Sequence, residues 1–472
     1  MRESPQSKKD LLQSLPPEWP VDLRPEIQQE IRSSGRKVVV LDDDPTGTQT
    51  VHSIPVLTGW NREALETELQ NESPVFYILT NSRSLPLDEA QRLNREIGSN
   101  LSDAAKGTGR DYVVVSRSDS TLRGHFPGEV EALADSLGRD FDGWIINPFF
   151  LEGGRYTIDD VHYVEEGGSL TPAGQTEFAR DSVFGYRSSN LREWVEEKTG
   201  GRISSKGVVS ITMEDLRKGG PDRVADKLKT LNRNAQCVVN AASYRDMEVF
   251  VLGLLAAEAQ GKRFLYRTAA SFVQVRGGIE PRPLLSREEI GPSPSGGGLV
   301  LVGSHVPRTT SQLQAVLAVH NVTGLEVKVE SILLEESKIS ELGRVARLVD
   351  NALHAGKDVV VYTSRKLYTA EDSKGNLLIG RRISDGLITL LRMLSEKPRY
   401  LLAKGGITAS DVATKGLNVK RAMVLGQILP GVPVWRLGEE CRLPGLAYIV
   451  FPGNVGNSEA VADVVKMLRY TA

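Results

Sequence analysis

The stretch KVVVLDDDPTGTQ, residues 37–49, decides the fold. Its apolar run 38–41 is short, β-branched and continuous, which is typical of a strand buried on both faces of a parallel sheet. The run ends in three adjacent carboxylates and a tight turn. Capping of the turn accounts for one Asp but not for three. Because ligands of parallel α/β sheets bind beyond the carboxyl ends of the strands, this end predicts a functional role for at least one of these carboxylates.

The same alternation of short apolar runs and helically spaced segments continues along the chain. It predicts an α/β fold in which mostly parallel sheets are flanked by helices. The expected strands are 38–41, 75–79, 112–115, 144–146, 208–211, 237–239, 264–266, 299–302, 359–362, 400–403, 422–424 and 447–451, and the expected helices are 87–101, 130–137, 224–231, 311–319, 339–355, 383–394 and 458–470.

The alternation is interrupted at residues 276–298, which are rich in Gly, Pro and Ser. We expect this segment to be an interdomain linker that builds no core, although a long surface loop within one domain has the same composition. The sequence therefore predicts two domains, 37–275 and 299–472. Residues 1–36 are expected to form a peripheral N-terminal arm.

Composition excludes several classes of protein. The 472 residues carry 58 Lys plus Arg against 60 Asp plus Glu, a net charge of −2, so no general attraction to nucleic acid or to anionic membranes is expected. Two cysteines cannot build a disulfide framework, which favours a reducing compartment. The chain has no apolar run of the ~20 residues that a membrane helix needs, and it starts without a secretory signal. We expect a soluble, cytoplasmic protein.

Charged and hydroxyl side chains gather at two further strand ends of the first domain. Residues 80–83 read TNSR, and residues 116–125 read SRSDSTLRGH. Arginine forks hold carboxylates, while Asp, Ser and Thr bond hydroxyl groups, so this set suits a small hydroxylated acid. A solvated loop with internal salt bridges is the alternative. Residues 155–162 are expected to form a loop, His125 and His162 are expected to be structural, and no histidine spacing indicates a metal site.

The second domain has glycine turns at three strand ends. They read GSH at 303–305, KGGITASD at 404–411 and PGNVGN at 452–457. Glycine lets backbone N–H groups approach a ligand closely, which favours an anion or nucleotide site. The chain has no P-loop motif, no G-x-G-x-x-G after a strand and no G-x-S-x-G elbow, so P-loop, dinucleotide-binding and α/β-hydrolase assignments are disfavoured.

These motifs together resemble those of the four-carbon acid sugar kinase family, which includes 3-oxo-tetronate, threonate and erythronate kinases. Residues 43–47 are similar to its D-D-x-T-G opening, 81–83 to its S-R segment and 117–124 to its K-x-D-S-T-x-R-G segment. Residues 303–304, 405–408, 429–433 and 453–456 resemble its second-half segments. The resemblance spans about residues 37–472, in order. Departures include Arg117 for Lys, Ile407 for Glu and Ala409 for Ser, and the turn at 44–49 differs from the commoner D-F-T-G-A.

The resemblance implies that the first domain binds a sugar acid, that the second binds ATP, and that the active site lies in the cleft between them. The implied contacts to the acid are made by Asp44, Arg83, Arg117, Ser118, Asp119 and Ser120. The implied contacts to ATP are made by Ser304, Gly405, Gly406, Ile407, Thr408 and Gly453.

The expected activity is ATP-dependent phosphorylation of a hydroxyl on a small sugar acid, by a phosphotransferase with an alcohol acceptor. Arg83 and Arg117 would hold the carboxylate, and Asp44 or Asp119 would orient the hydroxyl and accept its proton, with Asp44 preferred. The glycine turns would cradle the phosphates, Mg²⁺ would arrive with ATP rather than bind a protein-built site, and the linker would allow domain closure.

Two alternatives stay open from the sequence: a nicotinamide-dependent hydroxy-acid oxidoreductase, and a two-lobed sugar-acid sensor without catalysis. The sequence does not determine which acid or which hydroxyl is used, which of Asp44 and Asp119 is the base, or what the arm does. It also leaves the oligomeric state open, and a homodimer is compatible with it.

Overall fold

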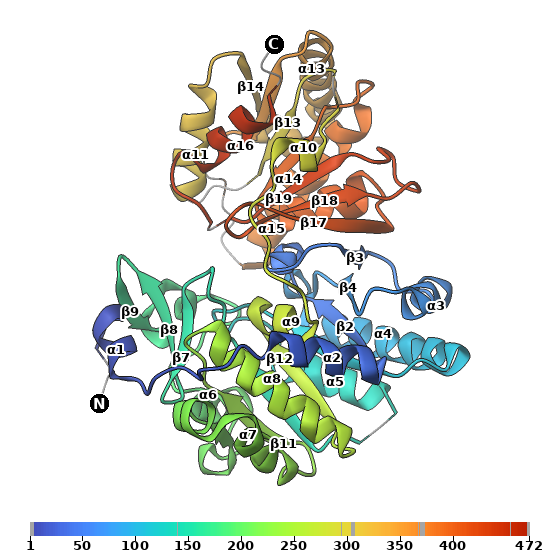
Figure 1. The fold of residues 1–472 in the computed structure, drawn as a ribbon. Coiled ribbons are helices and arrows are strands. Elements are labelled where there is room, and N and C mark those ends of the chain that lie inside the picture. The colour runs from blue at the N-terminus through green and yellow to red at the C-terminus, as the bar shows by residue number, and fades with distance from the viewer. Residues whose placement is uncertain are drawn as a thin grey trace. The chain divides into compact units, whose positions relative to one another are not determined.

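The computed structural model describes residues 4–138, 140–293, 295–303, 307–366, 368, 373–453 and 455–469. The chain forms two compact units (Figure 1). The first comprises Met1–Val51 and Gly59–Pro281, and the second comprises His52–Thr58 and Arg282–Ala472. Each unit is an α/β structure built on its own sheet region, which confirms the predicted fold class.

The first unit is built on a parallel sheet. Its strands lie in the order β10, β11, β6, β12, β5, β2, β4, and each neighbouring pair is parallel. The strands are β2 (Lys37–Asp42), β4 (Val75–Leu79), β5 (Tyr112–Arg117), β6 (Gly143–Asn147), β10 (Val209–Ile211), β11 (Ala235–Val239) and β12 (Phe264–Thr268).

Strand β2 lies inside this sheet, between β5 and β4. Val38, Val39 and Val40 are completely buried, as the continuous apolar run predicts for a strand covered on both faces. Burial of each such side chain stabilises the fold by about 1.5–3 kcal/mol. Lys37, which begins the strand, is also buried, and its ammonium donates hydrogen bonds to the backbone carbonyls of Asn71 and Ser73.

The helices of the first unit follow the strands in the predicted alternation. The helix predicted at 87–101 extends further, to Thr108, where Gly109 ends it in the left-handed conformation. The helices are α1 (Lys8–Ser14), α2 (Arg24–Ser34), α3 (Arg62–Gln70), α4 (Leu87–Thr108), α5 (Gly128–Ser136), α6 (Leu191–Lys198), α7 (Gly220–Lys229), α8 (Tyr244–Ala259) and α9 (Ala270–Arg276).

A small antiparallel sheet contradicts the expectation of a loop at 155–162. Strands β7 (Arg155–Ile158) and β8 (Val161–Glu166) form a hairpin, and β9 (Ser169–Pro172) and β1 (Gln6–Ser7) extend it. Both residues at the tip, Asp159 and Asp160, have positive φ. Two left-handed residues between short strands are typical of a type I′ hairpin turn, so the Asp pair is the signal that the loop interpretation overlooked.

The sheet of the second unit is mixed. Its strands lie in the order β3, β17, β18, β19, β16, β13, β15, β14, antiparallel from β3 to β19 and parallel from β19 to β14. The strands are β3 (Ile54–Leu57), β13 (Leu299–Val302), β14 (Val322–Val327), β15 (Asp358–Thr363), β16 (Leu401–Lys404), β17 (Arg421–Leu429), β18 (Val432–Leu437) and β19 (Ala447–Phe451). Strands β3, β14 and β18 were not predicted from the sequence.

The helices of the second unit include a short one within the segment 276–298. There the side chains of Leu285 and Ile290 are buried in the hydrophobic core of the second unit. The expectation that this segment builds no core is therefore wrong, because two apolar residues among the glycines and prolines are enough to fasten it. The helices are α10 (Arg287–Ile290), α11 (Pro307–Leu317), α12 (Val329–Leu333), α13 (Glu335–His354), α14 (Ser373–Met393), α15 (Gly406–Asp411) and α16 (Ala460–Leu468).

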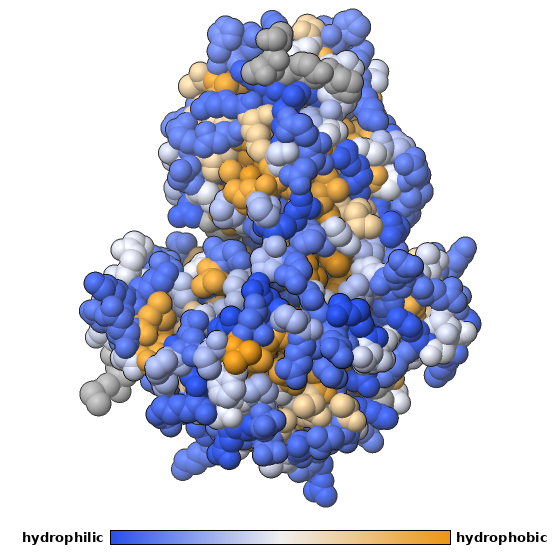
Figure 2. Space-filling view, viewed as in Figure 1, coloured by the Kyte–Doolittle hydropathy of each residue, from blue (hydrophilic) through white to orange (hydrophobic). Residues whose placement is uncertain are grey.

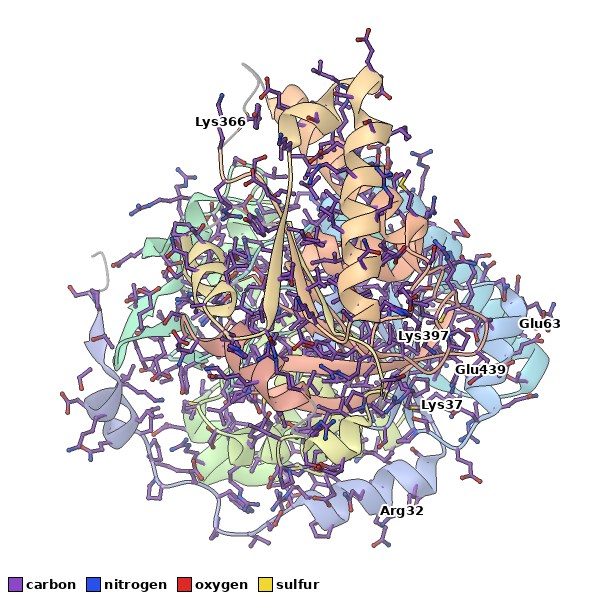
Figure 3. All side chains as sticks on the ribbon, turned by 90° about the horizontal axis from the view of Figure 1, so that it is seen from above. Arg32, Lys37, Glu63, Lys366, Lys397 and Glu439 are labelled. Atoms are coloured by element: carbon purple, nitrogen blue, oxygen red, sulfur yellow. The ribbon has the colours of Figure 1, made fainter. Side chains whose placement is uncertain are left out.

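One face of the molecule carries mainly charged and polar side chains. Figure 2 shows a face that is mostly hydrophilic, with hydrophobic patches of limited size. Among the described residues, no helix has both the length and the apolar character needed to cross a lipid bilayer. Figure 3 labels examples of exposed charged residues, which are Arg32, Glu63, Lys366, Lys397 and Glu439.

Candidate active site

The carboxyl ends of β2, β4 and β5 bring the predicted acid-binding residues together. Strand β2 lies between β4 and β5, and Asp42 is in register with Leu79 on one side and with Arg117 on the other. After β4 the chain crosses β2 to reach β5, so the strand order reverses here. Such a switch point is where open α/β sheets bind ligands.

Asp44 begins the short 3₁₀ helix η1 (Pro45–Thr48) as its N-cap. Its Oδ1 accepts a hydrogen bond from the backbone N–H of Thr46 at 2.8 Å, and its Oδ2 forms an ion pair with Nη2 of Arg83. Burial acts to raise the pKa of Asp44, but Arg83 and the hydrogen bonds from Thr46 lower this pKa below its usual value. The carboxylate is therefore ionised and already bonded at both oxygens.

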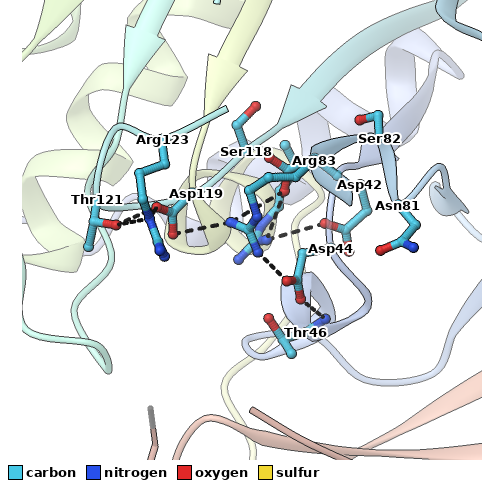
Figure 4. A network of polar contacts seen from close by, with 12 residues as sticks. Asp42, Asp44, Thr46, Asn81, Ser82, Arg83, Ser118, Asp119, Thr121 and Arg123 are labelled. Atoms are coloured by element: carbon cyan, nitrogen blue, oxygen red, sulfur yellow. Dashed lines mark hydrogen bonds and ion pairs between the residues drawn. The ribbon is translucent and has the colours of Figure 1, made fainter. Parts of the chain in front are cut away.

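Arg83 lies in the 3₁₀ helix η2 (Ser82–Ser84), directly after β4. Figure 4 shows its guanidinium among the carboxylates at the strand ends. Besides Asp44, its Nη1 lies 3.4 Å from Oδ1 of Asp119 and 3.9 Å from Oδ1 of Asp43. The Arg83 side chain keeps 19% of its surface exposed, so a ligand carboxylate can reach it.

Asp119, Ser118 and Ser120 follow β5 in one loop. Asp119 accepts a 2.7 Å hydrogen bond from Nε of Arg123. Although burial opposes it, Arg123 and Arg83 hold the pKa of Asp119 far below its usual value. The N–H of Ser118 donates to the carbonyl of Thr268 at 2.9 Å, and both serine residues are buried.

The carbonyl of Ser120 is fixed by His162 of the hairpin strand β8. Nε2 of His162 lies 2.7 Å from this oxygen, and Nδ1 lies 3.0 Å from Oγ1 of Thr157. Because a carbonyl only accepts, Nε2 carries the proton and Nδ1 accepts from the threonine hydroxyl. Burial lowers the pKa of His162 to about 4, so the ring is neutral at pH 7.

Arg117 differs from Arg83 although both were predicted to hold a carboxylate. Its side chain is 4% exposed, and its Nη1 forms a buried ion pair with Asp42 Oδ1 at 3.2 Å. The same Nη1 lies 3.9 Å from Oδ1 of Asp43. Arg117 therefore balances the buried aspartates, and Arg83 is the more accessible of the two guanidinium groups.

Some residues of this cluster were not predicted as site residues, among them Asp43 and Arg267. Asp43 was passed over in favour of Asp44. Arg267, in β12, is 4% exposed, donates from Nη2 to the carbonyl of Arg123 at 2.9 Å, and lies over the rings of Phe126 and Trp194. A charged residue at the end of a buried strand was the available signal for Arg267.

In the second unit the glycine turns follow three adjacent parallel strands. Strand β16 lies between β13 and β19, with Lys404 in register with Val302 and Phe451. Gly303, Gly405 and Gly453 therefore lie at one edge of this sheet. Ser304, which was predicted to contact ATP, lies outside the described residues.

Gly405 adopts φ +111°, a conformation that favours glycine, and its N–H donates to the carbonyl of Phe451 at 2.8 Å. The turn continues into α15 through Gly406, Ile407 and Thr408. The first amides of a helix have no intrahelical acceptor, so these N–H groups can bind an anion. The side chain of Ile407 is 61% exposed.

Lys404 was not predicted as a site residue, yet it joins two of the turns. Its side chain is fully buried, and its ammonium donates to the carbonyl oxygens of Pro452 and Gly453. It also lies 4.5 Å from the centre of the Phe451 ring. Burial, with a smaller contribution from Arg308, lowers the pKa of Lys404 to about 7. Arg308 and the protonated form of Lys404 place positive charge at this edge, which favours an anionic ligand.

In the described parts of the chain, no group of three or more His, Cys, Asp or Glu side chains has the arrangement of a metal site.

Known protein families match both halves of the chain. The family described as sugar-binding N-terminal domain matches residues 38–276, and the family described as nucleotide-binding C-terminal domain matches residues 299–461. A D-erythronate kinase of Heliobacterium modesticaldum is 25% identical over 464 residues, covering 91% of this chain and 97% of the relative. A D-threonate kinase of Cupriavidus necator is 24% identical over 428 residues, covering 88% and 87%.

Solved structures share the fold. A protein of Salmonella typhimurium LT2 aligns with a TM-score of 0.65 and 18% identity over 91% of this chain and 98% of its own. The Haemophilus influenzae protein HI1011 aligns with a TM-score of 0.61 and 19% identity over 91% of this chain and 100% of its own. With both halves matched in order, the chain belongs to the family that joins a sugar-binding N-terminal domain to a nucleotide-binding C-terminal domain, the four-carbon acid sugar kinases.

Proposed function

We propose that this protein is an ATP-dependent kinase that phosphorylates a hydroxyl group of a small, four-carbon or similar sugar acid. The observation that carries the proposal is the position of Arg83, a partly exposed guanidinium surrounded by Asp44, Asp119 and Asp43 at the switch point of the sugar-binding half. A guanidinium that can donate to a carboxylate, next to carboxylates that can accept hydrogen bonds from hydroxyl groups, matches the two kinds of group in a hydroxy acid.

In this proposal Arg83 binds the carboxylate of the acid, and the buried Arg117 adds positive charge near the site. Asp119 and the hydroxyl groups of Ser118 and Ser120 orient the hydroxyls of the acid. Asp44 and Asp119 stay the sequence-based candidates for the group that accepts the proton. Both carboxylates are ionised through their contacts with arginine, which suits an orienting role.

The nucleotide half is proposed to bind ATP through Gly405, Gly406, Ile407, Thr408 and Gly453, with Ser304 as a further predicted contact. The left-handed φ of Gly405 and the two cations Lys404 and Arg308 fit a polyphosphate. Mg²⁺ would be held by phosphate oxygens and water, and it neutralises charge on the transferred phosphoryl group.

Three further expectations remain predictions. They are the domain limits at 37–275 and 299–472 with a linker between them and an arm before them, a cytoplasmic location, and a homodimer. Sedimentation of the purified protein measures the oligomeric state directly.

The direct test offers purified protein ATP, Mg²⁺ and a panel of acids that includes both enantiomers of erythronate and threonate, with ADP release as the readout. Phosphorus NMR of the product identifies the phosphorylated hydroxyl. We expect acid-dependent ADP release with at least one four-carbon acid. Absence of acid-dependent ADP with every member of the panel contradicts the proposal.

The two alternatives from the sequence find no support among the relatives, both of which are named as kinases. A nicotinamide-dependent enzyme predicts quenching or enhancement of NADH fluorescence on binding. A sensor predicts thermal stabilisation by the acid but not by ATP. The kinase proposal predicts stabilisation by both ATP and the acid and no response to NADH.

A further inference from the structure

The carboxylate of Asp43 is buried without the hydrogen bonds that a buried carboxylate normally has. Its side chain is 4% exposed. Neither Oδ1 nor Oδ2 has a hydrogen-bond partner among the described residues. Buried polar groups are almost always bonded, and an unsatisfied one costs about 1–3 kcal/mol, more when it is charged. A fold that keeps this arrangement at a switch point holds the carboxylate ready for a partner that is not part of the chain.

Charged groups from several elements surround Asp43. Nη1 of Arg83, after β4, and Nη1 of Arg117, at the end of β5, each lie 3.9 Å from Oδ1. At that distance each guanidinium attracts the negative charge of Asp43, but the atoms are too far apart for a hydrogen bond. Glu129 in α5 and the neighbouring Asp44 repel the charge, and Arg267 in β12 attracts it. Asp42, the preceding residue, has its own partner in Arg117.

On the other side of the carboxylate lies Gly124, which has no side chain. A Cβ placed on Gly124 would lie 3.3 Å from Oδ2 of Asp43 and 3.5 Å from Nη2 of Arg267. Gly124 also has φ +112°. The loop after β5 thus passes close to Oδ2 without a side chain, at the place where the chain carries its predicted acid-binding residues.

The other two carboxylates of the cluster, Asp44 and Asp119, both accept hydrogen bonds. Asp44 is bonded by Thr46 and Arg83, and Asp119 is bonded by Thr121 and Arg123. A proton acceptor needs a lone pair that is not already committed to a cation or to a capping N–H. Of these three carboxylates, Asp43 is the one whose oxygens are both unoccupied by hydrogen bonds.

We propose that Asp43 accepts the proton of the acid hydroxyl that is phosphorylated, an assignment that rests on the proposed kinase function. In the step, the hydroxyl oxygen forms a bond to the γ-phosphorus of ATP while the bond from that phosphorus to the β,γ-bridging oxygen breaks. The hydroxyl proton moves to an Oδ of Asp43 and later to solvent. The products are the phosphorylated acid and ADP.

Burial, only partly opposed by Arg83 and Arg117, raises the pKa of Asp43 to about 6. A base is most effective when its pKa lies near the working pH, because it is then ionised yet still basic enough to take the proton. The pKa of Asp44 and that of Asp119 lie below their usual values, which makes both carboxylates weaker bases.

The test uses the full-length protein and the acid that gives turnover in the panel assay. Asp43→Asn is expected to lower kcat by about 10²–10⁴-fold, while the Kd of the acid, measured calorimetrically, changes by less than about threefold. Asp103→Asn, at an exposed position in α4, is the matched control and should equal wild type. A kcat within tenfold of wild type, or loss of acid binding instead of turnover, overturns the assignment.

The pH dependence gives a second readout that does not need the variant to fold. For wild type, kcat/KM for the acid is expected to rise with pH to a plateau, with its midpoint near 6. A profile that is flat from about pH 5 to 8 overturns the assignment. Wild-type protein without any acid-dependent ADP release overturns both the assignment and the kinase proposal, whereas an active wild type with an active Asp43→Asn overturns the assignment alone.

Discussion

Lys404 Nζ donates a hydrogen bond to the carbonyl oxygen of Gly453 at 3.1 Å, and this bond joins the ends of the neighbouring parallel strands β16 and β19. The ammonium also bonds the carbonyl of Pro452. A buried cation thus holds two glycine turns in one arrangement. Preorganised turns bind phosphates more tightly, because less backbone entropy is lost on binding.

Lys404→Met should therefore weaken ATP binding. It removes a positive charge beside the predicted phosphate site and leaves two carbonyls without their donor, each at a cost of about 1–3 kcal/mol. We expect the Kd of ATP to rise at least about tenfold, with a lower melting temperature. Calorimetry with a non-hydrolysable ATP analogue measures the change. Lys397→Met is the control, because this exposed lysine also bonds a carbonyl, that of Pro444; equal effects of the two variants would refute a specific role.

The register of the strands explains how much of the two sites was predictable. The run of valines predicts that β2 is a central strand, buried on both faces. Polar residues directly after a parallel strand predict a ligand site, because ligands bind at the carboxyl ends of these strands. Asp44, Arg83 and Asp119 were chosen on that basis, and the structure brings them together. Gly405 and Gly453 follow adjacent strands for the same reason.

The remaining features depend on contacts between segments that are distant in the sequence. Nothing local distinguishes Asp43 from Asp44; only the positions of Arg83, Arg117 and Thr46 decide which carboxylate is bonded. From the sequence alone a lysine such as Lys404 is expected at the surface, and its burial depends on the pairing of β16 with β19. Strand β3 pairs with β17, which lies more than 360 positions further along the chain. A local sequence pattern cannot predict a strand partner at that separation.

Arg83→Lys should raise KM for the acid by about 10–100-fold, a loss of about 1.4–2.8 kcal/mol. The planar guanidinium contacts Asp44 with Nη2 and Asp119 with Nη1. A single ammonium cannot reproduce that fork while also binding a carboxylate. Steady-state kinetics at saturating ATP measures the effect, and Arg92→Lys, at a side chain that is 69% exposed, is the control. An unchanged KM would remove Arg83 from the acid site.

Gly124→Ala should reduce both stability and acid-dependent turnover. At φ +112° a side chain is strained, by about 1–3 kcal/mol, and the added Cβ would lie 3.3 Å from Oδ2 of Asp43. Gly261→Ala separates these effects, because Gly261 has φ +90° and open space around it. Thermal unfolding should show a loss of stability in both variants, but only Gly124→Ala should lose activity. Equal activity of the two variants would mean that the space beside Asp43 has no function.

The neutral ring of His162 makes stability depend on pH in a defined direction. Its pKa in the folded protein, about 4, lies below the ordinary value of 6.5, so the unfolded chain binds the proton more tightly. Stability is therefore fully present above pH 6.5 and is lost as pH falls through 4, by on the order of 3 kcal/mol. His162→Gln lacks the titrating ring but keeps an N–H for Ser120. Urea unfolding between pH 4 and 7.5 should show a shallower decline for His162→Gln than for wild type, whereas replacement of the exposed His320 by Gln should leave the decline unchanged. Parallel curves for His162→Gln and wild type would mean that another group causes the acid sensitivity.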